Sequence, residues 1–134
     1  SMGSLHIYIG QPKQAVDQVK EAIRLNPNHY EWYVYYVGWA YEEAGMPKEA
    51  IEIFEQAIDL QNPNEEQLWY LPTIAAAYAH PTVGRMDDAR KVVKTVLSRD
   101  PEFSISKKVA RYPYKTKELA DRYANALRRA GLPE

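Results

Sequence analysis

The chain has 134 residues and a formal net charge of −1 at pH 7, with 46% hydrophobic and 26% charged residues. Such a length is enough for one compact domain with a core, and the balanced charge gives no overall bias toward nucleic acid or anionic lipid. The absence of cysteine excludes disulfides and thiolate metal sites and is consistent with a reducing, cytoplasmic location. No apolar run approaches the roughly 20 residues of a membrane span, so we expect no membrane partner.

The first four residues, Ser1-Met2-Gly3-Ser4, look like an expression scar rather than a signal peptide. We therefore exclude residues 1–4 from the fold. We expect the natural sequence to begin near Leu5 and the chain to be a piece of a longer protein.

An internal repeat organises the residues that follow. The segment Gly10–Ala15 (GQPKQA) matches Gly45–Ala50 (GMPKEA) at an offset of 35 residues. Each copy places glycine at the end of one helix and proline in the first turn of the next, where the missing N–H costs nothing. Apolar residues then recur at helical spacing, at Ala15, Val16, Val19, Ala22 and Ile23 and at Ala50, Ile51, Phe54, Ala57 and Ile58. Each second helix is predicted to run into an Asn-Pro pair, at 26–27 and 62–63.

A looser third copy follows the second. Its first helix is predicted from Leu71, Ile74, Ala75 and Tyr78, and its second from Ala89, Val93 and Val96. The second helix should end at Asp100-Pro101. Ala50 and Ala89 lie 39 residues apart, so about four residues are inserted, at least two of them in the turn at 80–84.

A repeat of about 34 residues made of two helices resembles the tetratricopeptide repeat. The matching residues are Gly38, Tyr41, Ala50, Phe54, Ala57 and Pro63 in the second copy, Ala75, Tyr78, Ala89, Val93, Val96 and Pro101 in the third, and Gly10, Ala15, Val19, Ala22 and Pro27 in the first. The resemblance implies an all-α fold, a right-handed α-α superhelix of about 2.5 repeats within residues 5–101. The ranges are a partial repeat at 5–27 and repeats at 28–63 and 64–101.

Within the second copy, small and large residues have separate tasks. We expect Gly38 and Ala50 to let two helix backbones approach closely, while Tyr41 and Phe54 fill the space beside them. These contacts would fix how the two helices of one repeat pack.

Residues 102–134 break the period and are predicted to form a helical cap. Phe103, Ile105 and Val109 indicate a short helix, broken by Tyr112-Pro113-Tyr114. Thr116 can cap a last helix, whose apolar stripe is Leu119, Tyr123, Ala126, Leu127 and Ala130. Gly131 and Pro133 are stop signals. The polar residues Asp121, Arg122, Asn125, Arg128 and Arg129 supply the outer face that a terminal solenoid unit needs.

The same tail carries a second resemblance. Phe103-Ser104, the segment Arg111–Lys115 and the ending Leu127–Glu134 resemble the C-terminus of bacterial adenylate/guanylate cyclase-type proteins, in which a catalytic domain precedes a tetratricopeptide region. The same tail occurs on related repeat proteins with a different N-terminal domain, such as a winged helix. The resemblance implies a C-terminal regulatory or assembly segment of a larger bacterial signalling protein. A stand-alone scaffold and the repeat part of a transcriptional regulator are the alternatives.

Catalytic and cofactor signals are absent from the sequence. The three histidines, His6, His29 and His80, lie far apart, and none has a partner at metal-ligand spacing. There is no glycine-rich phosphate loop. We therefore expect this fragment to be no enzyme and to hold no cofactor or metal, whatever the activity of the parent protein.

Surplus aromatic residues predict a partner-binding groove. Val34, Val37, Gly38 and Tyr41 share the stripe that faces the second helix, which leaves other aromatic rings on other faces. First helices line the concave groove in tetratricopeptide arrays, so the resemblance implies a groove formed by Trp32, Tyr35, Tyr36, Trp39, Glu42, Glu43, Trp69, Thr73, Ala76 and His80. Its acidic, aromatic character favours an apolar or basic peptide or a partner helix. The alternative is that these rings are core.

Two further surfaces are predicted. Basic residues gather late in the chain, and we read them as a solvated outer face, with an RNA or acidic-partner surface through Lys107, Lys108 and Arg111 as the alternative. The incomplete first repeat would leave apolar residues such as Val19 and Ile23 uncovered. We expect a homodimer to cover them.

Overall fold

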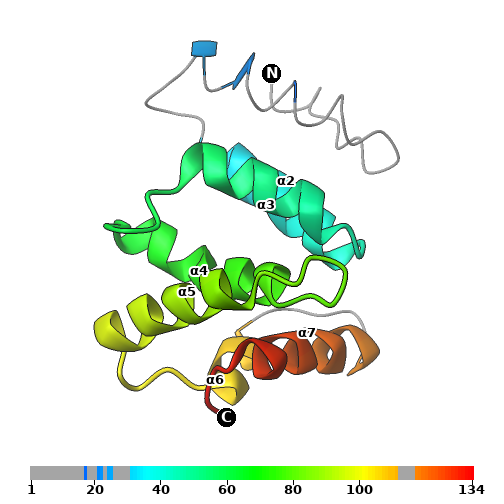
Figure 1. Ribbon diagram of the computed structural model, residues 1–134, viewed down its shortest axis with the longest axis vertical. Coiled ribbons are helices and arrows are strands. Elements are labelled where there is room, and N and C mark those ends of the chain that lie inside the picture. Colours follow the sequence, from blue (N-terminus) through cyan, green and yellow to red (C-terminus); the bar gives the residue numbers. More distant parts are fainter. Residues whose placement is uncertain (1–16, 18–20, 23, 26–30, 112–116) are drawn as a thin grey trace. The chain divides into compact units, whose positions relative to one another are not determined.

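The computed structural model describes residues 17, 21–22, 24–25, 31–111 and 117–134. Its helices are α2 (Glu31–Glu43), α3 (Pro47–Ala57), α4 (Glu65–Tyr78), α5 (Met86–Arg99), α6 (Ile105–Ala110) and α7 (Lys117–Ala130) (Figure 1). No strand occurs among these residues. The predicted all-α fold of paired helices is confirmed. The chain divides into two compact units, residues 1–58 and 59–134, and each is described by itself. The handedness of the superhelix stays a prediction.

In the first unit, α2 packs closely on α3. A Cβ atom added at Gly38 would lie 2.7 Å from two ring atoms of Phe54, closer than side chains can approach. Tyr41, Ala50 and Phe54 are fully buried. The prediction that a glycine allows this close approach, with large rings filling the space beside it, is confirmed.

The turn between these helices also forms as predicted. Gly45 has a φ of 77°, a left-handed conformation that glycine adopts without strain. The Met46 N–H donates to the Tyr41 carbonyl at 2.9 Å, which closes the end of α2. Pro47 is the first residue of α3.

The end of α3 differs from the prediction. The sequence predicts a helix that runs up to Asn62-Pro63, but α3 ends at Ala57, and Ile58 has an extended backbone. The carboxylate of Asp59 accepts hydrogen bonds from the backbone N–H groups of Gln61 and Asn62, both at 3.1 Å. This local side-chain turn competes with helix and stabilises the connector before the proline is reached.

Most of the predicted partial repeat at 5–27 lies outside the described residues. The five that are described, Asp17, Glu21, Ala22, Arg24 and Leu25, are all helical. The Arg24 guanidinium lies 2.6 Å from the Glu21 carboxylate, an exposed pair that contributes little to stability. The apolar residues expected to form a homodimer contact, such as Val19 and Ile23, lie outside this description.

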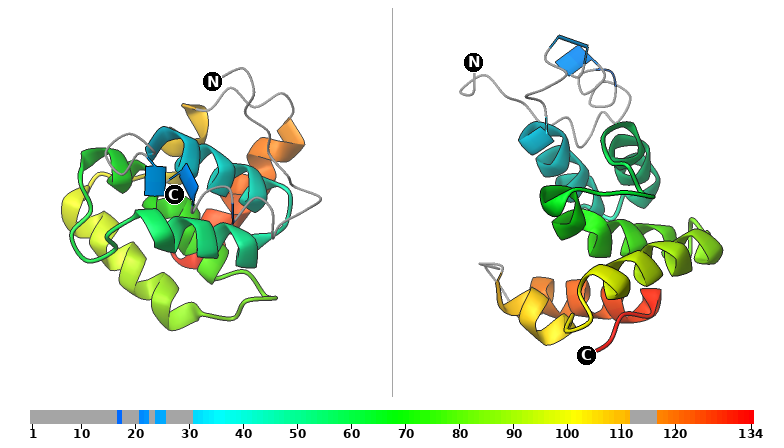
Figure 2. Two further views of the ribbon diagram at one scale, coloured as in Figure 1. Left: turned by 90° about the horizontal axis from the view of Figure 1, so that it is seen from above. Right: turned by 90° about the vertical axis from the view of Figure 1, so that its left-hand side faces the viewer.

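In the second unit, α4 packs against α5 on one side and α7 on another (Figures 1 and 2). The predicted apolar stripe of α4 is buried at Leu71, Ile74, Ala75 and Tyr78. The buried stripe of α5 is Ala89, Val92 and Val96, so Val92 takes the place that the sequence assigns to Val93. The second helix pair therefore forms within residues 64–101, and the inserted residues lengthen its turn.

A capping box begins α4. The Asn64 side chain accepts from the Gln67 N–H at 2.8 Å, and the Gln67 side chain accepts from the Asn64 N–H at 3.1 Å. We expect Asn64→Ala to lower the free energy of unfolding by about 0.5–2 kcal/mol, because a donor at the helix start loses its acceptor. Thermal unfolding followed by circular dichroism measures this. Asn64→Ser, which keeps an acceptor, should cost less, and an equal loss in both variants would contradict the capping role.

The tail of the chain closes the second unit. Ser104 caps α6, and the Ser104 hydroxyl donates to the Glu134 carbonyl at 2.8 Å while the Ile105 N–H donates to the Pro133 carbonyl at 2.9 Å. Gly131 has a φ of 100° and ends α7 as predicted. The polar face of α7 is exposed as expected of a cap, at Asp121, Arg122, Asn125, Arg128 and Arg129. Thr116, the predicted cap of α7, lies outside the described residues.

Candidate functional site

The structure divides the predicted groove residues of α2 into three kinds. The side chains of Trp32, Tyr36 and Glu43 lie outside those described. Trp39 and Glu42 are half-buried, so both retain surface that a partner could contact. The prediction that Tyr35 lines a groove is wrong, because the exposed fraction of its side chain is 0%. Tyr35 lies three residues before Gly38 and so borders the helix face that packs on α3, which favours the core alternative for this ring.

The α4 residues of the predicted groove need a further correction. Thr73 and Ala76 both have an exposed fraction of 0%. The Thr73 hydroxyl lies 2.8 Å from the Tyr123 hydroxyl of α7, a buried hydrogen bond between the repeat and its cap. Because Thr73 is hydrogen-bonded to α7, it belongs to the interior of the second unit, and neither Thr73 nor Ala76 is open to a partner.

His80 has a local partner in the turn after α4. The Nδ1 atom of His80 accepts a hydrogen bond from the Thr82 N–H at 3.2 Å and lies 2.9 Å from the Thr82 hydroxyl. Burial, and to a smaller extent the positive charge of Arg129, lowers the pKa of His80. The imidazole therefore orders the lengthened turn. A role in binding stays a prediction.

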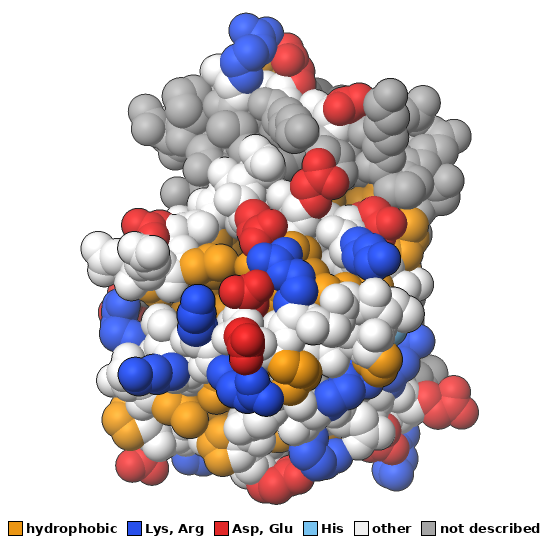
Figure 3. Space-filling view, in the orientation of Figure 1, with side chains coloured by type: hydrophobic (Ala, Val, Ile, Leu, Met, Phe, Trp, Pro, Cys, Tyr) orange, Lys and Arg blue, Asp and Glu red, His pale blue; other side chains and the backbone are white. Residues whose placement is uncertain are grey.

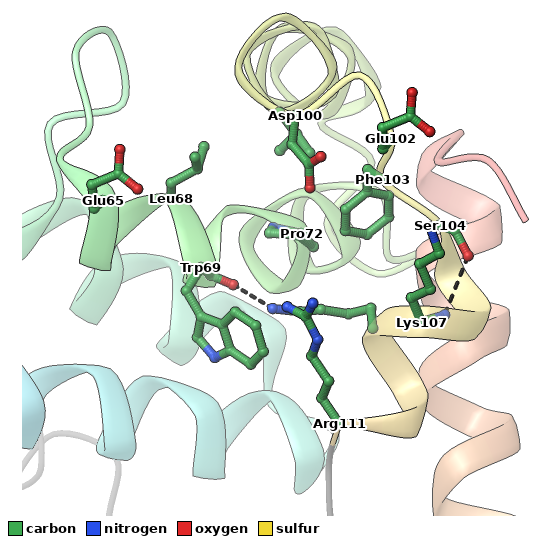
Figure 4. A pocket seen from close by; sticks show the side chains of 12 residues that line it. Glu65, Leu68, Trp69, Pro72, Asp100, Glu102, Phe103, Ser104, Lys107 and Arg111 are labelled. Atoms are coloured by element: carbon green, nitrogen blue, oxygen red, sulfur yellow. Dashed lines mark hydrogen bonds between the residues drawn. The ribbon is translucent and has the colours of Figure 1, made fainter.

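Trp69 is the predicted groove residue of α4 that borders a pocket. The pocket has a volume of about 300 Å³, at the small end for ligand sites. Side chains on one stripe of α4 form one wall: Glu65, Leu68, Trp69 and Pro72. The opposite wall is a stripe at α6 with the same spacing: Ser104, Lys107, Lys108 and Arg111 (Figure 4). Val96, Asp100, Glu102 and Phe103 complete the lining. We call this the Trp69 pocket.

Lys108 joins the two walls of the Trp69 pocket. Pro72 lies inside α4 and has no N–H, so the carbonyl of Leu68, four residues earlier, has no helical donor from residue 72. The Lys108 ammonium donates to the Trp69 carbonyl at 2.6 Å. The same nitrogen lies 3.3 Å from the centroid of the Trp69 ring, within the range of a cation–π contact. Lys108 thus fixes α6 and the indole relative to each other.

A second cation lies beside the indole. The Arg111 guanidinium carbon is 5.7 Å from the Trp69 ring centroid. Unlike Lys108, whose exposed fraction is 5%, Arg111 and Lys107 are exposed. The pocket wall at α6 therefore presents two positive charges that remain hydrated, beside the Lys108 amino group, which is committed to Trp69.

Burial and, secondarily, the Arg111 charge lower the pKa of Lys108 from 10.5 to about 7. Between these values the unfolded chain binds a proton at Lys108 that the folded chain does not, so this residue makes stability rise with pH above about 7. Between pH 6 and pH 9 we expect the free energy of unfolding of the wild type to rise by about 1–3 kcal/mol more than that of Lys108→Met. Denaturant titrations at both pH values measure this, with Lys107→Met as the exposed control. Parallel profiles for wild type and Lys108→Met would contradict it.

Sequence reasoning identified parts of the Trp69 pocket but not their assembly. The sequence predicts Trp69 as part of a binding surface and Lys107, Lys108 and Arg111 as part of a basic cluster. The signal that could have joined them is the shared spacing of i, i+3, i+4 and i+7 on two helices joined through α5. Phe103 was predicted only as part of a short helix, yet it lines the pocket.

The described part of the chain offers neither a metal-binding cluster nor a membrane span. Residues 31–111 and 117–134, with the five described residues before them, hold no group of three or more His, Cys, Asp or Glu that could bind a metal ion. Among the same residues, no helix has the length and apolar character to cross a bilayer. On the face shown in Figure 3, cations and anions are interspersed rather than gathered by sign.

Comparisons with known proteins support the repeat. Neither the comparison with curated proteins nor that with solved structures found a match. A family model described as tetratricopeptide repeat matches residues 1–65, which include the first and second copies of the internal repeat. This match and the helix pairs of both units support a tetratricopeptide-like domain with an all-α fold.

Proposed function

We propose that this chain is a protein–protein interaction module that binds a peptide segment or partner helix at the Trp69 pocket. Tetratricopeptide repeats in general mediate such interactions, and residues 1–65 match their family model. The observation that carries the proposal is Trp69 itself, a half-buried indole that forms one wall of a pocket and is held by Lys108. Rigid aromatic side chains of this kind are typical binding anchors.

A second surface is proposed on α2. Trp39 and Glu42 are half-buried and lie on the same helix three residues apart. Their combination of indole and carboxylate suits an apolar or basic peptide, as the sequence predicted. That α2 and α4 line one common groove stays a prediction.

The biological setting is also a proposal. We propose that the chain is the C-terminal regulatory or assembly segment of a larger, cytoplasmic bacterial signalling protein, with an adenylate/guanylate cyclase-type parent. Its support is the sequence of the tail from Phe103 to Glu134 alone. A stand-alone scaffold and a transcriptional regulator remain the alternatives, and the sequence that precedes Leu5 in the gene would distinguish them.

The RNA alternative has less support than the peptide proposal. Of the three cations assigned to it, Lys108 is buried and donates to the Trp69 carbonyl, which removes it from a phosphate contact. The exposed acidic residues Glu65, Asp100 and Glu102 line the same pocket and would repel a phosphate backbone.

A displayed library of random peptides, selected against the full chain, tests the proposed function. Because two surfaces are proposed, we expect at least one class of enriched peptides whose binding is lost with Trp69→Ala but kept with Trp39→Ala, a matched change in the other unit. Circular dichroism establishes that both variants stay folded, and Arg111→Ala, an exposed change, gives a second readout at the pocket. If every enriched peptide depended on Trp39 and none on Trp69, the site would be the α2 surface and not the Trp69 pocket. The absence of any Trp69-dependent peptide would overturn the proposal.

We propose self-association through the predicted apolar stripe near the N-terminal end, which includes Val16, Val19 and Ile23. Light scattering over a range of concentrations should show dimers that dissociate on dilution. Val19→Lys, placed on the predicted apolar stripe, should shift the chain to monomer, whereas a monomer at every concentration would contradict the proposal.

A further inference from the structure

The Trp69 pocket combines an apolar interior with charged residues at its edges. Leu68, Trp69 and Pro72 of α4 and Phe103 before α6 give it an apolar interior (Figure 4). At about 300 Å³ this interior holds a side chain or two rather than a folded domain. An apolar side chain of a partner segment is therefore the group that suits the interior.

Charges of opposite sign border this interior on different edges. Glu65, Asp100 and Glu102 lie along one edge, and Lys107 and Arg111 along the other. All five are exposed. The acidic edge comes from the start of α4 and from the α5–α6 connector, whereas the basic edge comes from α6. The separation is thus built into the order of the helices.

A pocket with separated charges selects a ligand with the opposite pattern. A ligand of one charge sign would be attracted to one edge and repelled by the other, because like charges brought together cost several kcal/mol. A ligand with both signs, spaced to either side of an apolar group, is attracted at both edges. Exposed edges also keep their charges hydrated in the free protein, so no buried unpaired charge results.

We infer that the Trp69 pocket recognises a dipolar peptide segment, in which an apolar side chain lies between a basic residue and an acidic residue. The apolar side chain contacts Trp69, Pro72 and Phe103. The basic residue of the peptide meets the edge of Asp100 and Glu102, and the acidic residue meets Lys107 and Arg111. This inference rests on the proposed function and adds the chemistry of the partner.

Charge reversals at the two edges test the inference in the same random peptide library. The variants are Lys107→Glu and Glu102→Lys, both exposed, and the control is Lys94→Glu, an exposed lysine of α5 outside the pocket. With wild type and control we expect acidic and basic residues on opposite sides of an apolar residue. Lys107→Glu should replace the acidic residue of the selected peptides by a basic one, and Glu102→Lys should do the reverse. Binding of the best wild-type peptide should weaken about tenfold in either variant.

The outcomes separate the inference from the function on which it rests. Peptides that need Trp69 but show no charge pattern, or a pattern that neither reversal changes, would overturn the inference and leave the proposed function standing. No Trp69-dependent peptide would overturn both. A titration with poly(U) at two salt concentrations adds a further arm: binding that is lost in Lys107→Glu but kept in Lys94→Glu would overturn the inference in favour of RNA.

Discussion

Replacing Tyr35 by alanine is expected to lower the free energy of unfolding by about 3–5 kcal/mol, the range for large aromatic residues in a core. The ring of Tyr35 is fully buried in α2, beside the face that packs on α3 through Gly38 and Phe54. Truncation removes the buried ring and leaves a cavity in the core. Denaturant titration followed by circular dichroism measures the loss, together with the helicity that remains at 25 °C.

Trp39→Ala is the matched control for this prediction. Trp39 lies on the same helix but is only half-buried, so its truncation should cost clearly less than that of Tyr35. Tyr35→Phe keeps the ring and should retain most of the stability, which separates packing from the hydroxyl group. If Tyr35→Ala were as stable as wild type, the ring would be a surface group and the groove interpretation of Tyr35 would return.

Gly38→Leu is expected to lower the free energy of unfolding by about 3 kcal/mol, the upper end of ordinary overpacking. Even a single Cβ atom at this position would lie 2.7 Å from the Cε1 and Cζ atoms of Phe54, whose side chain is fully buried. The gain in helix propensity on leaving glycine, about 1 kcal/mol, does not offset this clash. Thermal unfolding of the variant and wild type measures the difference.

A double variant makes the cause of this loss testable. Phe54→Ala alone should cost about 3–5 kcal/mol, because it leaves a cavity at the α2–α3 contact. Combined with Gly38→Leu, the new side chain occupies the vacated space, and the double variant should be more stable than the sum of the single losses by about 1–3 kcal/mol. Additive losses would show that residue 38 does not contact Phe54. If Gly38→Leu alone fails to fold, a double variant that folds still shows that residue 38 contacts Phe54.

The repeat pattern allowed the helix pairs to be predicted because short-range physics sets them. Helical spacing of apolar residues, glycine at a helix end and proline at a helix start act within one or two turns of the chain. Gly45 and Pro47 define the α2–α3 turn in this way, and Gly131 ends α7. The contact of Gly38 with Phe54 was also predictable, since a glycine on a buried stripe faces a large ring in the matching position of the next helix.

The end of α3 shows where a local signal was overlooked. Proline at residue 63 predicted the latest point at which the helix could stop, but Asp59 stops it earlier by accepting two backbone N–H groups. An aspartate two residues before a potential turn is a known competitor of helix. Whether such an aspartate ends the helix depends on the hydrogen bonds that the following backbone makes. The spacing of apolar residues gives no information about these bonds.

Burial of individual side chains was decided by partners that lie far away in the sequence. Thr73 is 50 residues from Tyr123, and only the packing of α7 on α4 makes it interior. The sequence predicts Lys108 as a surface cation, yet its side chain is buried and its terminal nitrogen lies against the carbonyl and the indole of Trp69.

The sequence by itself therefore determined the helices, their pairing and the contact of small with large residues, because these follow from local periodicity and turn chemistry. Only the tertiary structure decided which predicted binding residues are core and which border a pocket. The reason is physical: exposure depends on what the rest of the chain places against a helix face. Stripes on α4 and α6 become the two walls of the Trp69 pocket only in the folded second unit, where α7 packs on both helices.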